Sequence, residues 1–286
     1  MSKQIWNILG CLLLVILLIS ACQPQPSVVV KKPAVVPVLA PPVPTVTPAG
    51  PKITLYYVGK SAQVELVSPQ GIRVLIDVAY PAMLSSPPTE QDILLTTHHH
   101  ADHFVPSFLK SFPGPQLDVQ VGEISKGDVT IHSIMAEHAA TNFGAASICP
   151  NAIYIVDMGG LRIVHFGDFG QEQLSPEQLA ALGNVDVAIS LLGDPTIFEQ
   201  IMKDRTMFKL MAQVKPKLII PTDHSSMDSV GYAAQQWQGF YSSNNPVTIE
   251  RADLSGGTKF LVMGTLATSY QLLYHLSPWG SLAASL

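Results

Sequence analysis

The sequence predicts an α/β fold, a sandwich of two β-sheets with helices on the outside. Short segments rich in β-branched residues recur from Ile53 to Met263, and helical segments alternate with them in the second half. Glycine and proline residues separate these segments, and about 235 residues are available for one domain. Hydrophobic residues make up 47% of the 286-residue chain, so the chain can bury a full core.

The N-terminal half of this domain is predicted to consist mainly of strands. Three β-branched segments form a meander, and a fourth, fully apolar segment ends at a group of histidines. Three more strands follow, and Gly159-Gly160 supplies a tight turn between the last two. The predicted strands are residues 53–58, 62–67, 72–77, 92–96, 129–136, 151–157 and 161–167.

The C-terminal half is predicted to alternate helices with strands. One helix begins at Ser175, because serine is a good N-cap and Pro176 suits the first helical position. Residues 196–214 have helical length and apolar residues at helical spacing. Strands are predicted at residues 186–191, 217–221 and 258–263.

The composition excludes some classes of function. Charged residues make up 13% of the chain, about half of the usual share. Lysine and arginine number 16 against 21 aspartates and glutamates, so the formal net charge is −5. A nucleic-acid-binding protein needs a basic surface to neutralise phosphates, and we therefore expect no nucleic-acid partner. Three cysteines are too few for a disulfide framework.

Residues 1–21 are interpreted as a lipoprotein signal peptide. The apolar run Ile8–Ser20 is shorter than the roughly 20 residues of a membrane-spanning helix. Ile19-Ser20-Ala21-Cys22 resembles the lipobox of bacterial lipoproteins, which implies that Cys22 is acylated, with palmitate or a similar chain, and becomes the N-terminus. The alternative is an uncleaved membrane anchor. Both interpretations place the chain outside the cytoplasm, at the cell surface or the periplasmic face of a membrane.

Residues 22–51 are predicted to be a tether between this lipid anchor and the domain. Proline recurs there among valine, alanine and threonine. Because proline fixes φ and lacks an N–H donor, the segment cannot form a helix or pair in a sheet. We expect a semi-extended spacer with a rise of ~3 Å per residue. The globular domain then comprises residues 52–286.

A group of histidines follows the predicted strand 92–96. In the run His98-His99-His100-Ala101-Asp102-His103, residues 98 and 100 point to the same side if the backbone is extended, and residues 102 and 103 lie one turn further on. Imidazoles gathered beside a carboxylate are typical of a site for a divalent metal such as zinc, iron or manganese. The alternative is a histidine-rich surface loop that binds metal adventitiously.

Three further candidate ligands each follow a separate predicted strand. His138 follows strand 129–136, Asp168 follows strand 161–167, and His224 follows strand 217–221. Loops at strand ends are where a rigid scaffold displays functional groups. Their positions therefore favour one shared site.

This combination resembles the metallo-β-lactamase superfamily, with its His-x-His-x-Asp-His motif followed by a lone His, a lone Asp and a lone His. The resemblance covers nearly the whole domain and implies an αββα four-layer sandwich of two mixed sheets flanked by helices. It implies two divalent metal ions, zinc in the first place, with Mn²⁺ or Fe²⁺ as alternatives. It assigns His98, His100 and His138 to the first ion, Asp102, His103 and His224 to the second, and Asp168 to both.

Within the superfamily, the sequence is most similar to the ascorbate-6-phosphate-lactonase-like branch. It departs from that branch at Gly59-Lys60-Ser61, where the branch usually has histidine, and at Pro221-Thr222-Asp223-His224, which is one residue longer. Asp223 therefore competes with His224 as a ligand, and we favour His224. Typical zinc β-lactamases lack a bridging aspartate, so antibiotic hydrolysis is not expected.

Three residues near the motif are expected to lack direct metal contacts. The ring of His99 should point away from the ions. His165, just before Asp168, is expected in the core or behind the ligands. Asp77, at the end of the third strand, is expected to support a ligand or to cap a turn.

The resemblance implies a binuclear hydrolase. Two ions about 3.5–4 Å apart lower the pKa of a bridging water, and the resulting hydroxide attacks an ester-like bond. Asp102 and Asp168 are the candidate catalytic residues, because either can hold the proton of the hydroxide. The expected substrate is a small or lipid-like lactone or phosphodiester. The alternatives are a di-iron redox enzyme of the same fold and a non-catalytic extracytoplasmic lipoprotein that binds a metal or another ligand.

Overall fold

The computed structural model describes residues 52–58, 62–138, 150–192, 206–222, 227–264 and 274–279. All of them belong to one compact unit, Pro48–Leu286. The predicted signal peptide, the tether, Asp223 and His224 lie outside the described residues, as do Cys22 and Gly59-Lys60-Ser61. Among the helices described, none combines the length and the hydrophobicity needed to cross a bilayer.

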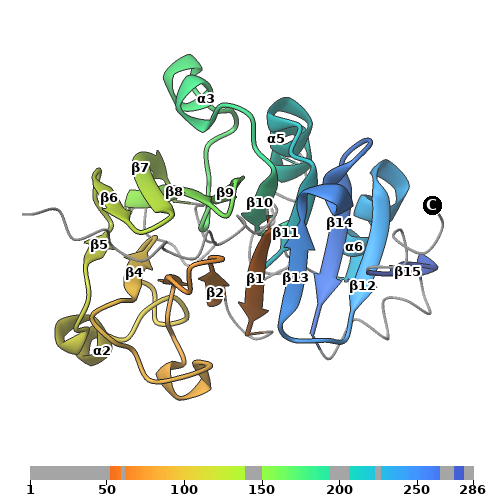
Figure 1. Ribbon diagram of the computed structural model, residues 1–286. Coiled ribbons are helices and arrows are strands. Elements are labelled where there is room, and N and C mark those ends of the chain that lie inside the picture. The colour runs from red at the N-terminus through yellow and green to blue at the C-terminus, as the bar shows by residue number, and fades with distance from the viewer. Residues whose placement is uncertain are drawn as a thin grey trace, which may run out of the picture. The chain divides into compact units, whose positions relative to one another are not determined.

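The first sheet has six strands in the order β13-β1-β2-β3-β4-β5 (Figure 1). The meander β1-β2-β3 is antiparallel, as predicted, whereas β3, β4 and β5 run parallel to one another. The strands are β1 (Lys52–Tyr57), β2 (Val64–Val67), β3 (Arg73–Ile76), β4 (Ile93–Thr96), β5 (Gln116–Asp118) and β13 (Val247–Glu250).

The second sheet has nine strands in the order β15-β12-β14-β11-β10-β9-β8-β7-β6. Strands β6 to β9 are antiparallel, and from β9 to β15 neighbouring strands are parallel. The strands are β6 (Glu123–Lys126), β7 (Val129–Glu137), β8 (Pro150–Met158), β9 (Leu161–His165), β10 (Val187–Ser190), β11 (Leu218–Pro221), β12 (Gln238–Ser242), β14 (Lys259–Met263) and β15 (Ser277–Pro278).

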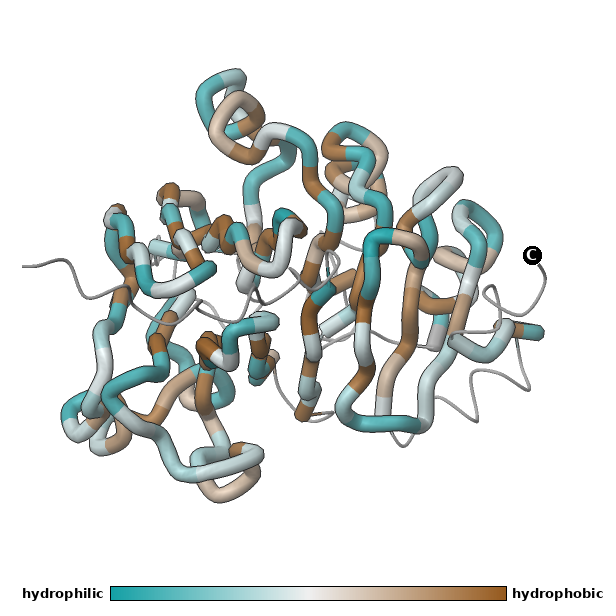
Figure 2. The backbone as a smooth tube through the Cα atoms, viewed as in Figure 1, coloured by the Kyte–Doolittle hydropathy of each residue, from teal (hydrophilic) through white to brown (hydrophobic). Residues whose placement is uncertain are grey.

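The two sheets pack face to face, and helices cover their outer faces. Alternate residues of the strands in both sheets form the largest apolar cluster, between the sheets (Figure 2). A second cluster joins the other face of the second sheet to α3 (Pro176–Leu182), α5 (Thr206–Val214) and α6 (Met227–Gln236). A third joins the first sheet to α2 (Pro106–Ser111) and to the residue after the 3₁₀ turn η1 (Pro81–Met83). These layers confirm the predicted αββα sandwich.

The predicted start of α3 is confirmed by its capping box. The hydroxyl of Ser175 accepts a hydrogen bond from the backbone N–H of Gln178 at 3.2 Å, and the side chain of Gln178 accepts one from the N–H of Ser175 at 2.8 Å. The tight turn between β8 and β9 is also confirmed, since Gly159 and Gly160 have φ values of 54° and 71°.

Some elements differ from the prediction. The predicted helix 196–214 is described only as α5, because residues 193–205 lie outside the described part. The predicted strand 161–167 ends at His165, because Gly167 has a φ of 57° that leaves the β region. Sequence patterns did not predict α2, α6, β5, β6, β12 or β13, most of which are six residues or shorter. The 3₁₀ turn η2 (Arg251–Leu254) follows β13.

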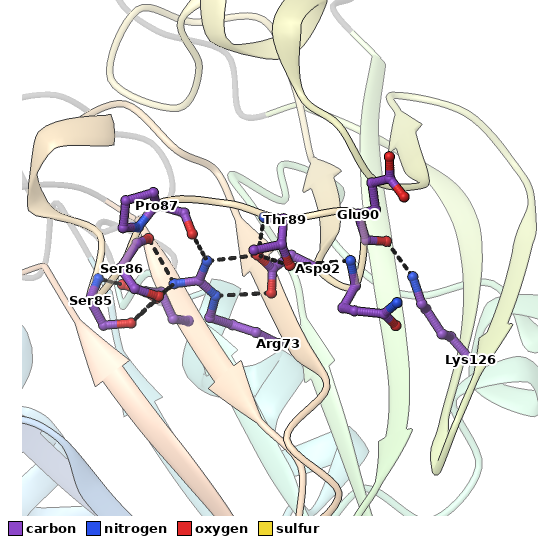
Figure 3. A network of polar contacts seen from close by, with 10 residues as sticks. Arg73, Ser85, Ser86, Pro87, Thr89, Glu90, Asp92 and Lys126 are labelled. Atoms are coloured by element: carbon purple, nitrogen blue, oxygen red, sulfur yellow. Dashed lines mark hydrogen bonds and ion pairs between the residues drawn. The ribbon is translucent and has the colours of Figure 1, made fainter.

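Arg73 on β3 ties the segment that follows η1 to the first sheet (Figure 3). Its guanidinium donates to both carboxylate oxygens of Asp92, at 3.1 and 2.7 Å, and to Glu65 at 3.3 Å. It also donates to the backbone carbonyls of Ser86 and Pro87, at 2.9 and 3.0 Å. Since all of the donors act within this network, it holds residues 85–92 in one conformation.

Candidate metal centre

The candidate ligands gather at one edge of the sandwich, where strands end. Parallel strands β3 and β4 lead into Asp77 and His98. Strands β7 and β9 are both antiparallel to β8, so they run in the same direction and lead into His138 and Asp168. Strand β11 ends at this edge too, but His224 lies beyond the described residues. Residues that are 70 positions apart in sequence therefore meet in one place.

Four of the predicted ligands form a compact group. One ligand atom from each of His98, His100, His138 and Asp168 lies within 4.8 Å of the others. The Nε2 atoms of His98 and His138 lie 3.8 and 3.5 Å from Oδ2 of Asp168. These are the three histidines that the family resemblance assigns to the first ion, together with the aspartate that it assigns to both.

His103 approaches the other oxygen of the same carboxylate. Its Nε2 lies 3.6 Å from Oδ1 of Asp168, whereas His98 and His138 face Oδ2. The two oxygens of Asp168 therefore face different histidines, His98 and His138 on one side and His103 on the other. Asp102 is half-buried, and its charge acts on both His100 and His103.

Asp77 holds His103 from behind. The Asp77 carboxylate is fully buried and accepts hydrogen bonds from the N–H and the hydroxyl of Thr97, both at 2.7 Å. Its Oδ2 also lies 3.0 Å from Nδ1 of His103, which directs Nε2 toward Asp168. Burial would lower the pKa of His103, but the charges of Asp77 and Asp168 outweigh it and raise this pKa to about 9. Asp77 therefore supports the ring of His103, a candidate ligand.

The turn that presents Asp168 depends on Asn151. Its side chain donates to the carbonyl of Phe166 at 2.8 Å and accepts from the N–H of Asp168 at 3.1 Å. Gly167 lies between them with a φ of 57°, and a Cβ on it would lie 2.3 Å from Oδ1 of Asn151. Sequence reasoning missed Asn151, because an asparagine at the start of a strand carries no signal of its role.

The donor set fits divalent cations. The Nε2 atoms of His98 and His103 are buried and have no hydrogen-bond partner among the residues described, an arrangement that proteins seldom leave unsatisfied. Burial, with a contribution from the charge of His103, lowers the pKa of His98 to about 3, so its ring is neutral and its nitrogen can bind a metal. Burial would raise the pKa of Asp168, but the neighbouring histidines lower it below its ordinary value. A neutral imidazole such as that of His98, beside an ionised carboxylate, is a typical zinc ligand.

His99 and His165 occupy the positions expected of them. His99 is exposed, contacts Oδ1 of Asp118 through Nε2 at 2.6 Å, and stacks on Phe104 with 4.5 Å between ring centroids. His165 is buried, and its Nδ1 accepts a hydrogen bond from the N–H of Gly167 at 3.1 Å. Neither belongs to the compact group of ligands.

Comparison with known proteins identifies the family. The family model described as the Beta-lactamase superfamily domain matches residues 54–223. No curated protein matches the sequence. A protein of the metallo-beta-lactamase superfamily from Thermotoga maritima has a similar structure, with 18% identity, a TM-score of 0.52, and coverage of 74% of this chain and 100% of that one.

Two further solved structures are more distant. A metallo hydrolase from the archaeon Ignicoccus hospitalis is 16% identical, with a TM-score of 0.47 and coverage of 74% of this chain and 95% of that one. A metallo-beta-lactamase fold protein from Bacillus subtilis is 12% identical, with a TM-score of 0.43 and coverage of 73% and 96%. The similarity to the Thermotoga maritima protein, at 18% identity, shows a shared fold alone. The family match covers more than half of the chain, and it shows that this protein belongs to the beta-lactamase superfamily.

Proposed function

We propose that this chain is a metal-dependent hydrolase that cleaves an ester-like bond with two divalent ions. The observation behind the proposal is the position of Asp168, whose two oxygens face different histidines. A protein that only carries a metal ion has no need of a carboxylate shared between two groups of ligands. The family match is consistent with the proposal.

The proposal divides the residues between the ions as the family resemblance implies. His98, His100 and His138 would hold one ion, and Asp102, His103 and His224 would hold the other, with Asp168 between them. Zinc suits this set of imidazoles and carboxylates, and Mn²⁺ and Fe²⁺ are the alternatives. When bound, the ions lower the pKa of a water molecule and stabilise negative charge on the substrate.

The side chains of the chain itself orient the reactants. Asp168 stays ionised because of its lowered pKa, so its carboxylate can accept a hydrogen bond from the attacking water. Asp102 is the second carboxylate that can hold that proton and later deliver it to the leaving oxygen. Asp77 fixes the ring of His103, and Asn151 fixes the turn that carries Asp168. These residues keep the ligands in place before the substrate arrives.

The proposed substrate is a lactone or a phosphodiester, small or lipid-like. The resemblance to the ascorbate-6-phosphate-lactonase-like branch favours a lactone, although Lys60 replaces the histidine that this branch has in its first motif. The net charge of −5 disfavours a polyanionic polymer. Attachment to a membrane would favour lipid-like esters.

We further propose that the chain is a lipoprotein attached through Cys22 to the outer side of a membrane. The lipobox-like sequence before Cys22 and the proline-rich segment after it support this location. Metabolic labelling with a palmitate analogue tests it. The wild-type chain should incorporate label into the membrane fraction, and Cys22→Ser should not. Equal labelling of the two would contradict acylation at this residue.

Metal analysis followed by a substrate screen tests the catalytic proposal. The purified chain should contain close to two divalent ions, and it should hydrolyse members of a panel of lactones, phosphodiesters and carboxylic esters. Asp168→Ala serves as the inactive variant, and Asp118→Asn, at a carboxylate outside the ligand group, serves as its matched control. Two irons with oxygen-dependent turnover would favour the redox enzyme instead. Full metal loading without hydrolysis of any ester would favour a binding lipoprotein.

A further inference from the structure

One exposed turn carries an unusual pair of apolar side chains. Among the described residues, only Tyr80, Met83 and Val121 are large hydrophobic residues classed as exposed, at 40%, 57% and 68%. Tyr80 caps η1 and Met83 ends it, three residues later. The N–H of Met83 donates to the carbonyl of Tyr80 at 2.9 Å, so the two residues lie in one tight turn. Exposed apolar side chains that lie together, within a surface of low charge, are candidates for an interaction site.

The protein holds this pair on its surface. The side chain of Gln63, which is fully buried, accepts a hydrogen bond from the N–H of Tyr80 at 2.8 Å and donates one to its carbonyl at 3.3 Å. Beyond the turn, Arg73 fixes the carbonyls of Ser86 and Pro87 (Figure 3). With both ends fixed, η1 cannot fold inward to bury its apolar residues.

The turn belongs to a larger surface of low charge. Leu84, Phe108 and Leu109 are partly buried and pack against the same apolar cluster, so η1 and α2 form one layer on the first sheet (Figure 1). We call residues 78–89 and 104–112 the η1–α2 face. Residues 78–89 contain no charged side chain, and residues 104–112 contain only Lys110, which is exposed.

The η1–α2 face adjoins the metal centre. Its first segment begins directly after Asp77, and its second begins directly after His103. Asp77 and His103 are in contact, with Oδ2 and Nδ1 3.0 Å apart. The beginnings of both segments are therefore close to the metal centre, whereas Ser86 and Pro87 are held by Arg73 at the start of β3.

We propose that the η1–α2 face docks on a lipid bilayer, with Tyr80 and Met83 in the interfacial region and Lys110 at the headgroups. Tyrosine combines an apolar ring with a polar end, and lysine can extend its charge toward headgroups, so both suit this boundary. The absence of other charges limits the cost of contact with lipid. The inference rests on the membrane attachment proposed above and not on the chemistry at the metal centre.

Two quantities favour a bilayer over a second copy of the chain. If each side chain offers about 200 Å², the exposed fractions of Tyr80 and Met83 give roughly 200 Å² together, whereas a stable dimer buries ~800 Å² per partner. A tether of about 30 residues at ~3 Å per residue would also leave the orientation of the domain open. A small apolar contact can then select which face meets the membrane.

Spin labels on the full chain test this docking surface. The variant Met83→Cys carries a nitroxide on the proposed docking surface. Val121→Cys, at another exposed residue, is the matched control. The parent chain, labelled in parallel, gives the signal that comes from the native cysteines. The chains are reconstituted with phosphatidylcholine vesicles and recovered by co-sedimentation. The measured quantity is the collision rate of the nitroxide with oxygen, which is enriched in lipid, relative to a water-soluble nickel chelate.

We expect this oxygen-to-nickel ratio to be severalfold higher at position 83 than at position 121. If the chains co-sediment but the ratio is equally low at the two positions, as in water, the docking proposal is wrong and the proposed membrane attachment still holds. Failure to co-sediment would overturn both. Dipolar broadening between labels at position 83 would identify a second copy as the occupant and would also overturn the proposal. None of these readings depends on turnover, so the proposed hydrolase activity stands or falls separately.

Discussion

Replacing Asp77 by asparagine should weaken metal binding, although it changes none of the candidate ligands. The carboxylate of Asp77 is the acceptor that holds Nδ1 of His103. Asparagine has nearly the same shape, and it tolerates the left-handed backbone at this position, where φ is 52°. The substitution therefore changes hydrogen-bonding character with little change in volume.

The size of the effect follows from the contacts of Asp77. The Oδ1 contact with the N–H of Thr97 can survive in asparagine, but Oδ2 contacts both the Thr97 hydroxyl and His103. An NH₂ group at the Oδ2 position would donate to Nδ1 of His103, and the ring proton would then sit on Nε2, the atom that faces Asp168. Losses of 10–100-fold in metal affinity are usual when such a partner is removed, or about 1.4–2.8 kcal/mol.

A chelator competition assay measures this loss, with thermal unfolding of the same samples as a check on folding. Asp118→Asn is the matched control, because Asp118 holds His99, which lies outside the ligand group. We expect the control to bind metal like the wild type. If Asp77→Asn keeps wild-type affinity, or if both variants lose affinity equally, then the carboxylate behind His103 does not orient a ligand.

Three further perturbations test the site and the fold. Asp168→Ala should lose bound metal and hydrolysis together, measured as ions per chain and turnover, and retention of both would refute its bridging role. Gly167→Ala places a methyl group 2.3 Å from a side-chain oxygen at a φ of 57°, so we expect the free energy of unfolding in urea to fall by about 2–4 kcal/mol. The control Gly256→Ala, where nothing lies within 4 Å of the added methyl group, should lose about 1 kcal/mol. Burial would raise the pKa of Asp92, but the hydrogen bonds and charge of Arg73 outweigh it and lower this pKa below 3.8. A carboxylate whose pKa is lowered by folding stabilises the folded state above its unfolded-state pKa, and this stabilisation is lost as pH falls through its folded-state pKa. The wild type should therefore be more stable than Asp92→Asn at neutral pH, and this difference should disappear below about pH 4. Urea unfolding at several pH values measures it.

Some features of the fold could be predicted because they depend on local physics. The start of α3 follows from Ser175 and Gln178, which satisfy each other's backbone N–H groups within four residues. The turn at Gly159-Gly160 follows from backbone freedom that only glycine has. Short elements gave no such signal: β5 has three residues and α2 has six, and tertiary packing forms both.

The candidate ligands were predictable for a similar reason, and their arrangement was not. His98 and His100 lie close together in any extended chain, and the lone residues His138 and Asp168 each follow a recognisable strand. The sequence could not show which oxygen of Asp168 faces which histidine, because that depends on the register of β7, β8 and β9. The part of Asn151 in holding Asp168 was hidden for the same reason.

By itself, the sequence determined the positions of most strands along the chain, the residue types suited to a metal centre, and the family resemblance that the domain match supports. Only the tertiary structure decided that Asp77 holds His103, that Asp168 stands between two sets of histidines, and that Tyr80 and Met83 stay exposed. The reason is physical: propensities and capping act between neighbours in the chain, whereas hydrogen bonds between strand ends depend on how two sheets pack.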